Sequence, residues 1–220
     1  MTYIENIFVC MIAPPLIAVF CAGKKRRSSF LFVIAGMGTC LLSAYINTFF
    51  ARLYGADVIT ATVEIAPVVE EIMKLLPLLF YLLIFEPGRA HAHSAILIIA
   101  VSFATFENVC YLTENGAAEL SHLLIRGFGT GAMHIVCGTI VGGGLLYVWR
   151  QPLLKAAGTF GLLCVAISYH AIYNLLLSAG GPLQTAAYLV PVDTVLIGLI
   201  TVNLIRAKRS KQAAAAGQHV

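Results

Sequence analysis

Seven apolar stretches, each long enough to cross a membrane, constrain the fold of this chain more than any other feature. A helix needs about 20 apolar residues to cross the ~30 Å hydrocarbon layer of a bilayer. Only 11% of the residues are charged, too few to cover the surface of a water-soluble protein of this length. Because backbone polar groups in lipid must be paired within their own segment, we predict an all-α, polytopic membrane helical bundle of about seven transmembrane helices. The stretches cover residues 3–22, 28–51, 58–83, 94–113, 122–149, 156–180 and 185–205.

The basic residues between the stretches predict how the chain is oriented. They concentrate after the first, third, fifth and seventh stretches, as in Lys24 to Arg27 and at Lys155. Cytoplasmic loops carry such an excess, so we expect the N-terminus outside and the C-terminus in the cytoplasm. The net charge of +4 is explained by these anchors and requires no nucleic acid. We expect one transmembrane domain over 1–208, with the first stretch retained as a helix, and a disordered cytoplasmic tail over 209–220.

Ionisable and amide side chains gather in the third to sixth stretches, within residues 58–180. A charged residue at the centre of a transmembrane helix costs roughly 2.5–3.5 kcal/mol on insertion scales, so such residues are functional candidates. Counting 1.5 Å per residue from the outer end of each stretch gives depths of roughly 9–20 Å. We therefore predict a water-filled pocket that opens toward the outer half of the membrane. The residues at these depths are Glu70, Glu71, Glu107, His134, His170 and Asn174.

Helical spacing around the acidic pair predicts its local surroundings. Lys74 follows Glu70 by four residues and Glu71 by three, so it shares a face with either and is expected to be a charge partner. Pro67 and Pro77 flank the pair and should locally break or kink the helix. Such irregular backbone is tolerated in a membrane where it lines a cavity.

This set of residue types favours hydrolysis by an activated water molecule. Two adjacent carboxylates in a low dielectric cannot both ionise easily, so one of them can serve as a general base. Two histidines at similar depth can bind the water or donate to an oxyanion, and Asn174, one turn after His170, suits an oxyanion donor. No serine or cysteine stands in a comparable arrangement, which disfavours a covalent nucleophile.

Four short motifs appear in order on successive stretches. They are EEIMK at 70–74, FENVCY at 106–111, Arg126 followed by His134 and Gly138, and HAIYN at 170–174. Over about residues 60–180 the chain thereby resembles the PrsW family of glutamic-type intramembrane proteases, distant relatives of the membrane CAAX-processing and bacteriocin-immunity proteases. The lysine of EEIMK matches the PrsW pattern, where the CAAX-type pattern has arginine.

The resemblance implies an intramembrane endopeptidase of the bacterial plasma membrane that acts in regulated proteolysis. Its expected partners are the lipid bilayer and a membrane-anchored protein substrate, such as an anti-sigma factor, cut near the extracytoplasmic face. Glu70 and Glu71 would be the catalytic carboxylates, with Glu70 favoured as the base on water. Glu107 stands where CAAX-type relatives have the histidine of an FxxxH motif, with Phe103 as the matching aromatic. The remaining catalytic contacts would come from His134, His170 and Asn174.

A metal ion is the open question within this family, since some family descriptions call its members metalloproteases. We expect no cofactor, because the HExxH spacing of many zinc proteases is absent from the sequence. The alternative is a catalytic zinc in an open site. Its ligands would come from Glu71, Glu107, His134 and His170.

Two other function classes fit the same buried residues. An ion- or proton-coupled transporter would also place Glu and His within the membrane. Against it, the first two stretches hold no counterpart of the acidic helix, as an inverted repeat would require. A catalytically idle immunity or scaffold protein is the third possibility.

Overall fold

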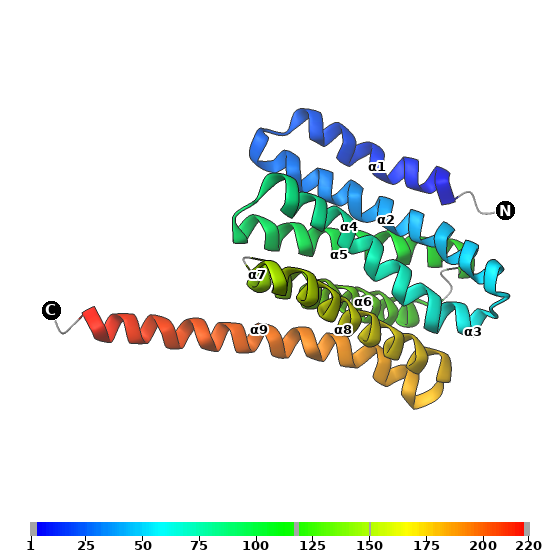
Figure 1. Cartoon of the computed structure of the whole chain (residues 1–220). Coiled ribbons are helices and arrows are strands. Elements are labelled where there is room, and N and C mark those ends of the chain that lie inside the picture. The colour runs from blue at the N-terminus through cyan, green and yellow to red at the C-terminus, as the bar shows by residue number, and fades with distance from the viewer. Residues whose placement is uncertain (1–3, 117–118, 150, 218–220) are drawn as a thin grey trace.

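A computed structural model of the chain describes residues 4–116, 119–149 and 151–217 and shows a bundle of long helices lying side by side (Figure 1). Within these ranges every regular element is helical, which confirms the predicted all-α fold. The elements are α1 (Ile4–Cys21), α2 (Lys24–Tyr54), α3 (Val58–Thr60), η1 (Ala61–Ile65), α4 (Ala66–Phe85), α5 (Arg89–Asn115), α6 (Leu120–Gly138), η2 (Thr139–Gly143), α7 (Gly144–Val148), α8 (Pro152–Ala179) and α9 (Gly181–Gly217). The third apolar stretch is one continuous run of α3, the π-helical turn η1 and α4, and α6 continues through the π-helical turn η2 into α7.

Six helices of the described chain are long and apolar enough to cross a membrane. The remaining predicted crossing is the third apolar stretch, which forms α3, η1 and α4 and is also helical throughout. It differs from the other six in carrying three charged side chains near its middle, at Glu70, Glu71 and Lys74. The chain is therefore a multi-pass membrane protein in which one helix carries most of the buried charge.

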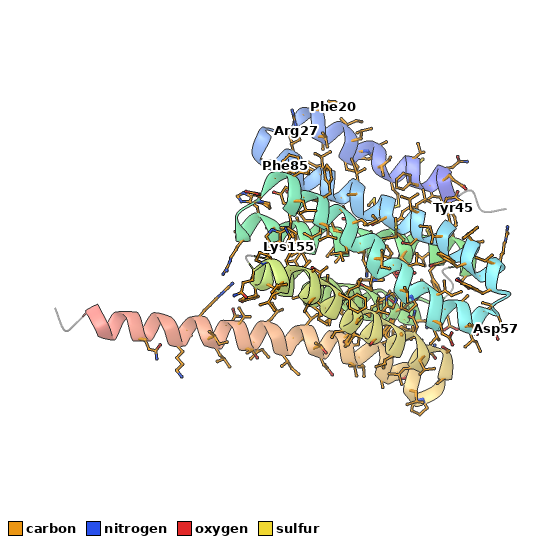
Figure 2. The ribbon with its side chains drawn as sticks, viewed as in Figure 1. Phe20, Arg27, Tyr45, Asp57, Phe85 and Lys155 are labelled. Atoms are coloured by element: carbon orange, nitrogen blue, oxygen red, sulfur yellow. The ribbon has the colours of Figure 1, made fainter. Side chains whose placement is uncertain are left out.

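The two ends of the chain lie at opposite ends of the bundle, as an odd number of crossings requires (Figure 1). Arg27 and Lys155 lie at one end, and Asp57 lies at the other (Figure 2). The basic residues thus separate from this acidic turn along the bundle axis, which is the pattern from which the orientation is predicted. Which end faces the cytoplasm stays a prediction.

The turn between α2 and α3 has clear local causes. Gly55 ends α2 with φ of 62°, a left-handed conformation that glycine adopts at little cost. The backbone N–H of Thr60 donates to the Asp57 carboxylate at 2.7 Å and so caps α3. This hydrogen bond holds the pKa of Asp57 below its usual value.

Pro67 shapes the backbone just before the acidic pair, as its position predicts. In the π-helical turn η1 the carbonyl of Thr62 would accept from residue 67, but proline has no N–H to donate. The freed carbonyl accepts instead from the side-chain amide of Asn174 on α8, at 2.9 Å. A side chain from a neighbouring helix thus pairs the backbone group that this proline leaves free.

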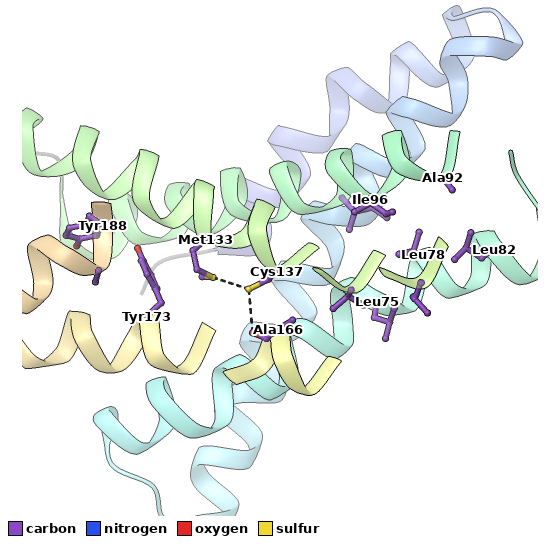
Figure 3. Packing of buried hydrophobic residues seen from close by; sticks show 14 residues of the cluster. Leu75, Leu78, Leu82, Ala92, Ile96, Met133, Cys137, Ala166, Tyr173 and Tyr188 are labelled. Carbon is purple, nitrogen blue, oxygen red and sulfur yellow. Dashed lines mark hydrogen bonds between the residues drawn. The ribbon is translucent and has the colours of Figure 1, made fainter. Parts of the chain in front are cut away.

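The larger apolar core joins residues of α4, α5, α6, α8 and α9 (Figure 3). The thiol of Cys137 within it donates to the carbonyl of Ala166 at 3.5 Å. A narrow void of about 20 Å³ connects this core with Glu71 and Lys74. Elsewhere α2 and α5 approach so closely that a Cβ on Gly36 would lie 2.6 Å from the carbonyl oxygen of Ile99.

The last helix is longer than the seventh apolar stretch. It continues to Gly217, into the segment 209–220 for which a disordered tail is expected. Alanines at 213–216 have the highest intrinsic helix propensity and favour this extension. Residues 218–220 lie outside the described residues.

Candidate active site

Ionisable side chains from α4, α5, α6 and α8 meet in the interior of the bundle. The structure brings together five of the six predicted site residues and places the sixth, Asn174, apart from them. Two sets of contacts divide the site. The inner network consists of Glu71, Lys74, His134 and His170, and the pocket wall consists of Asn47, Glu70, Glu107 and Arg126.

The inner network is almost completely buried. The Lys74 ammonium donates to Glu71 Oε1 at 2.6 Å and to His134 Nδ1 at 2.8 Å. His170 Nδ1 lies 2.8 Å from the same oxygen of Glu71. The exposed fractions of Glu71 and Lys74 are 2% and 6%, so this ion pair is shielded from water and lipid. The i, i+3 spacing of these two residues is thus realised as a buried charge pair.

The hydrogen-bond partners fix the tautomers of both histidines. His134 accepts from Lys74 at Nδ1, so its proton is on Nε2, which contacts the carboxylate of Glu107. A neutral His170 that donates from Nδ1 to Glu71 has a lone pair on Nε2. That Nε2 lies 3.8 Å from Glu70 Oε2. The free ring nitrogen of His170 and the carboxylate of Glu70 therefore face each other.

The two carboxylates of the pocket wall are more exposed than Glu71. Glu70 accepts one hydrogen bond, from the side-chain amide of Asn47 at 3.3 Å, and is 14% exposed. Glu107 is 29% exposed and lies 3.5 Å from the guanidinium of Arg126. That guanidinium also donates to Asn108 and stacks 3.6 Å from the ring centre of Tyr111. Arg126 is thereby fixed by three partners at the edge of the site.

A pocket of about 230 Å³ opens onto this wall. It reaches both Glu70 and Glu107 but not Glu71. Water or a peptide in the pocket would meet the carboxylate of Glu70, while Glu71 stays behind it. Its lining comes from five helices and includes Ile4 of α1, Cys40 and Asn47 of α2, Glu70 of α4, Glu107 and Tyr111 of α5, and Arg126 of α6.

Three side chains of the inner network and the pocket wall could hold a metal ion. One ligand atom each from Glu70, His134 and His170 lie within 4.8 Å of one another. Two imidazoles and a carboxylate form the ligand set of an open zinc site. The bond from His170 Nδ1 to Glu71 is the outer contact that such a ligand requires, although His134 would have to give up one of its two present partners. The donor set fits a zinc ion.

This set differs from the one expected from the sequence in its carboxylates. Glu71 is occupied by Lys74 and His170, and Glu107 by His134 and Arg126. Glu70 takes their place, because it is the carboxylate that faces the free ring nitrogen of His170.

Asn174 does not point its amide at the site. It follows His170 by one turn, but its Nδ2 donates to Thr62 in the turn η1. The amide is thus committed to a backbone carbonyl, and the structure gives it a structural contact in place of the predicted oxyanion contact.

Sequence reasoning missed Asn47 and Arg126 as site residues. Arg126 offered a signal, since it is a basic residue inside the fifth stretch and not at a cytoplasmic break. Asn47 is an isolated amide in an otherwise apolar stretch, and its contact with Glu70 depends on how α2 packs against α4. Phe103 is buried beside the site, with its ring centre 5.1 Å from that of His134.

The fold and these contacts define a multi-pass membrane protein with a buried cluster of carboxylates and imidazoles beside a pocket. The family model described as PrsW family intramembrane metalloprotease matches residues 24–202, which include every residue of the inner network and the pocket wall. The chain belongs to the PrsW family of intramembrane proteases. No curated protein and no solved structure matches the chain.

Proposed function

We propose that this protein hydrolyses a peptide bond in a membrane-anchored protein substrate, using a water molecule activated at Glu70. The single observation that carries the proposal is the position of Glu70, which lies in the pocket next to the free nitrogen of His170 and has only one hydrogen-bond partner among the described residues. A carboxylate so placed can accept a proton from water.

In this mechanism the water oxygen attacks the carbonyl carbon of the scissile peptide while its proton passes to Glu70. The tetrahedral oxyanion accepts hydrogen bonds from the site, where the protonated Nε2 of His134, now paired with Glu107, is a possible donor. The C–N bond then breaks, and Glu70 returns the proton to the leaving amine. Glu71 and Lys74 hold His170 and His134 in the orientations that this sequence of steps requires.

The charge balance of the cluster is compatible with a bound cation. If all three carboxylates are ionised and the histidines neutral, the two basic side chains leave one excess negative charge in the membrane interior, which a cation or a proton on Glu70 would compensate. Such a charge is costly to bury without compensation. The family description as metalloproteases points the same way. We propose Glu70, His134 and His170 as the ligands of a zinc ion, which would supply a Lewis acid and a more acidic water. Glu70 would then hold the ion and no longer accept the proton, so in the metal-bound site Glu107 would take the role of base that Glu70 has without metal.

The proposed place of action is the extracytoplasmic half of a bacterial plasma membrane. The pocket lies toward the end of the bundle that holds the N-terminus, because Ile4 and Glu114 both line it. The positive-inside rule assigns that end to the outside. A substrate resembling an anti-sigma factor, anchored by a single span, would present its cleavage site there, as in regulated proteolysis.

The test is cleavage of a single-span reporter protein by the purified protein in proteoliposomes. We expect cleavage by the natural chain and by Glu64→Gln, since Glu64 is exposed and outside the site, and none by Glu70→Gln. Ion flux that Glu70→Gln abolishes, without cleavage, would favour the transporter. Absence of both activities would favour the idle scaffold.

Elemental analysis of the purified protein tests the metal separately from activity. We expect close to one zinc per chain, lost in His170→Ala and retained in Glu64→Gln. A chain that cleaves the reporter at full rate after chelation and without metal would remove this part of the proposal.

A further inference from the structure

Helix α1 covers one side of the pocket but contributes little to the core. Among the 18 residues of α1, Val19 alone is buried, and the mean hydropathy of the helix is 2.0. The first half of α1 lies against a groove between α2 and α5, where Phe8 and its neighbours pack on Cys40 and Phe106. Ile4 at its end lines the pocket. An apolar transmembrane helix therefore sits in this groove with its end at the mouth of the site.

The first half of α1 is held by apolar packing on α2 and α5 and by one side-chain hydrogen bond. The Phe8 ring meets the Phe106 ring edge-on, with centres 5.5 Å apart. The hydroxyl of Tyr45 donates to the carboxylate of Glu5 on an exposed surface. Pro14 and Pro15 interrupt the backbone hydrogen bonds in the middle of α1, so its first half can bend away from its second.

The second half of α1 is tied down separately. The guanidinium of Arg27 at the start of α2 donates to the carbonyl of Val19 at 3.0 Å. The match to the protease family begins at residue 24, after α1, and includes both helices that form the groove. The groove therefore lies within the matched segment, and α1 precedes it.

The pocket beneath α1 also contains an unused hydrogen-bond acceptor. Asn47 donates its amide N–H to Glu70, but its buried Oδ1 has no partner among the residues that the structure describes. A buried acceptor without a partner is costly.

We infer that the groove between α2 and α5 is the seat of the substrate's transmembrane helix, and that the first half of α1 occupies it until the substrate displaces it. This inference rests on the proposed function. The groove already accepts an apolar helix at membrane depth, as α1 shows. A helix in this seat ends at the pocket, so the chain that follows it enters beside Asn47 and Glu70.

The first test measures opening of the groove without any proteolysis. The full chain carries Cys40 as its only cysteine, because Cys40 is 7% exposed, lines the pocket and packs under α1. A charged, water-soluble methanethiosulfonate reagent is added to proteoliposomes. We expect Phe8→Ala to speed modification of Cys40 about tenfold by removing the aromatic contact. Phe20→Ala is the matched control, on the same helix but 77% exposed, and should leave the rate unchanged.

The second test holds α1 in place. In a chain without native cysteines, Glu5→Cys and Tyr45→Cys are joined by a short bifunctional methanethiosulfonate. We expect cleavage of the single-span reporter to fall about tenfold or more, and to recover when the link is reduced. The two single variants treated with the same reagent are the controls.

Equal modification of Cys40 in Phe8→Ala and Phe20→Ala would overturn the inference, and so would full cleavage by the linked chain. If the unlinked chain cleaves nothing, the proposed function fails, while the modification rates still decide whether α1 opens.

Discussion

Glu71 belongs to a closed network of buried partners, whereas Glu70, the residue before it, faces an open pocket. Successive residues of a helix point about 100° apart, so α4 directs two identical carboxylates into two environments. Glu71 contacts Lys74 and His170 and is 2% exposed, while Glu70 has Asn47 alone and is 14% exposed. Neighbouring helices, and not the acidic motif itself, set which carboxylate faces the pocket and which one is buried among charged partners.

The two histidines repeat this contrast. His134 uses both ring nitrogens, toward Lys74 and Glu107, and is fully buried. His170 uses one nitrogen toward Glu71 and presents the other to Glu70. The reacting side of the site is thus expected where groups retain unused hydrogen-bonding capacity.

The largest expected effect is on catalysis at Glu70. Glu70→Gln should lower the cleavage rate by roughly 10²–10⁴-fold, the usual contribution of a general base. The amide has the shape of the carboxylate and interrupts no ion pair, so thermal unfolding in detergent should match that of the natural chain. Cleavage within a few-fold of the natural rate would show that the pocket-facing carboxylate is not the base.

At Glu71 the main effect should be on stability. Glu71→Gln leaves the buried ammonium of Lys74 without its charge partner, and breaking such a pair costs roughly 3–5 kcal/mol. Unfolding titrations in mixed micelles measure the loss. Adding Lys74→Met should restore much of the stability but not the cleavage. An unfolding free energy equal to that of Glu70→Gln would erase the distinction between the two carboxylates.

A smaller effect on the cleavage rate is expected at Arg126, which orients Glu107 and does not contact Glu70 or His170. Arg126→Gln should lower the cleavage rate by roughly 10–100-fold, as loss of an orienting partner does. Arg126→Lys keeps the charge but not the planar fork that reaches Glu107 and Asn108, so its cleavage rate should lie between those of the natural chain and Arg126→Gln. Equal rates in all three chains would show that Glu107 needs no such partner.

The smallest effect is expected at Asn174. Asn174→Ala leaves the carbonyl of Thr62 unpaired and should cost about 1–3 kcal/mol of stability, with the cleavage rate reduced less than about tenfold. A fall of about 10²–10³-fold without loss of stability would instead restore the oxyanion role that its sequence position suggests.

The fold was predictable because hydropathy dominates the sequence, and a membrane permits few solutions to it. The turn between the second and third stretches shows how local chemistry places helix boundaries, because Gly55 ends α2 and Asp57 caps α3. The acidic helix was predictable because charge inside a membrane is expensive and therefore conspicuous.

The contacts inside the site were less predictable, because they depend on the backbone register. Pro67 indicated an irregular turn but not that Thr62 would lose its partner and engage Asn174. Lys74 follows Glu70 by four residues and Glu71 by three, and both spacings allow an ion pair on a helix, so the sequence alone leaves the pairing open. Packing against His170 of α8 decides it.

The most direct test of the central claim is an experimental structure of the Glu70→Gln variant with an uncleaved single-span reporter bound. We expect the scissile carbonyl in the pocket between Glu107, His134 and His170, within hydrogen-bonding distance of one imidazole. A reporter bound outside this pocket, or a residue 70 that faces lipid away from His170, would contradict it.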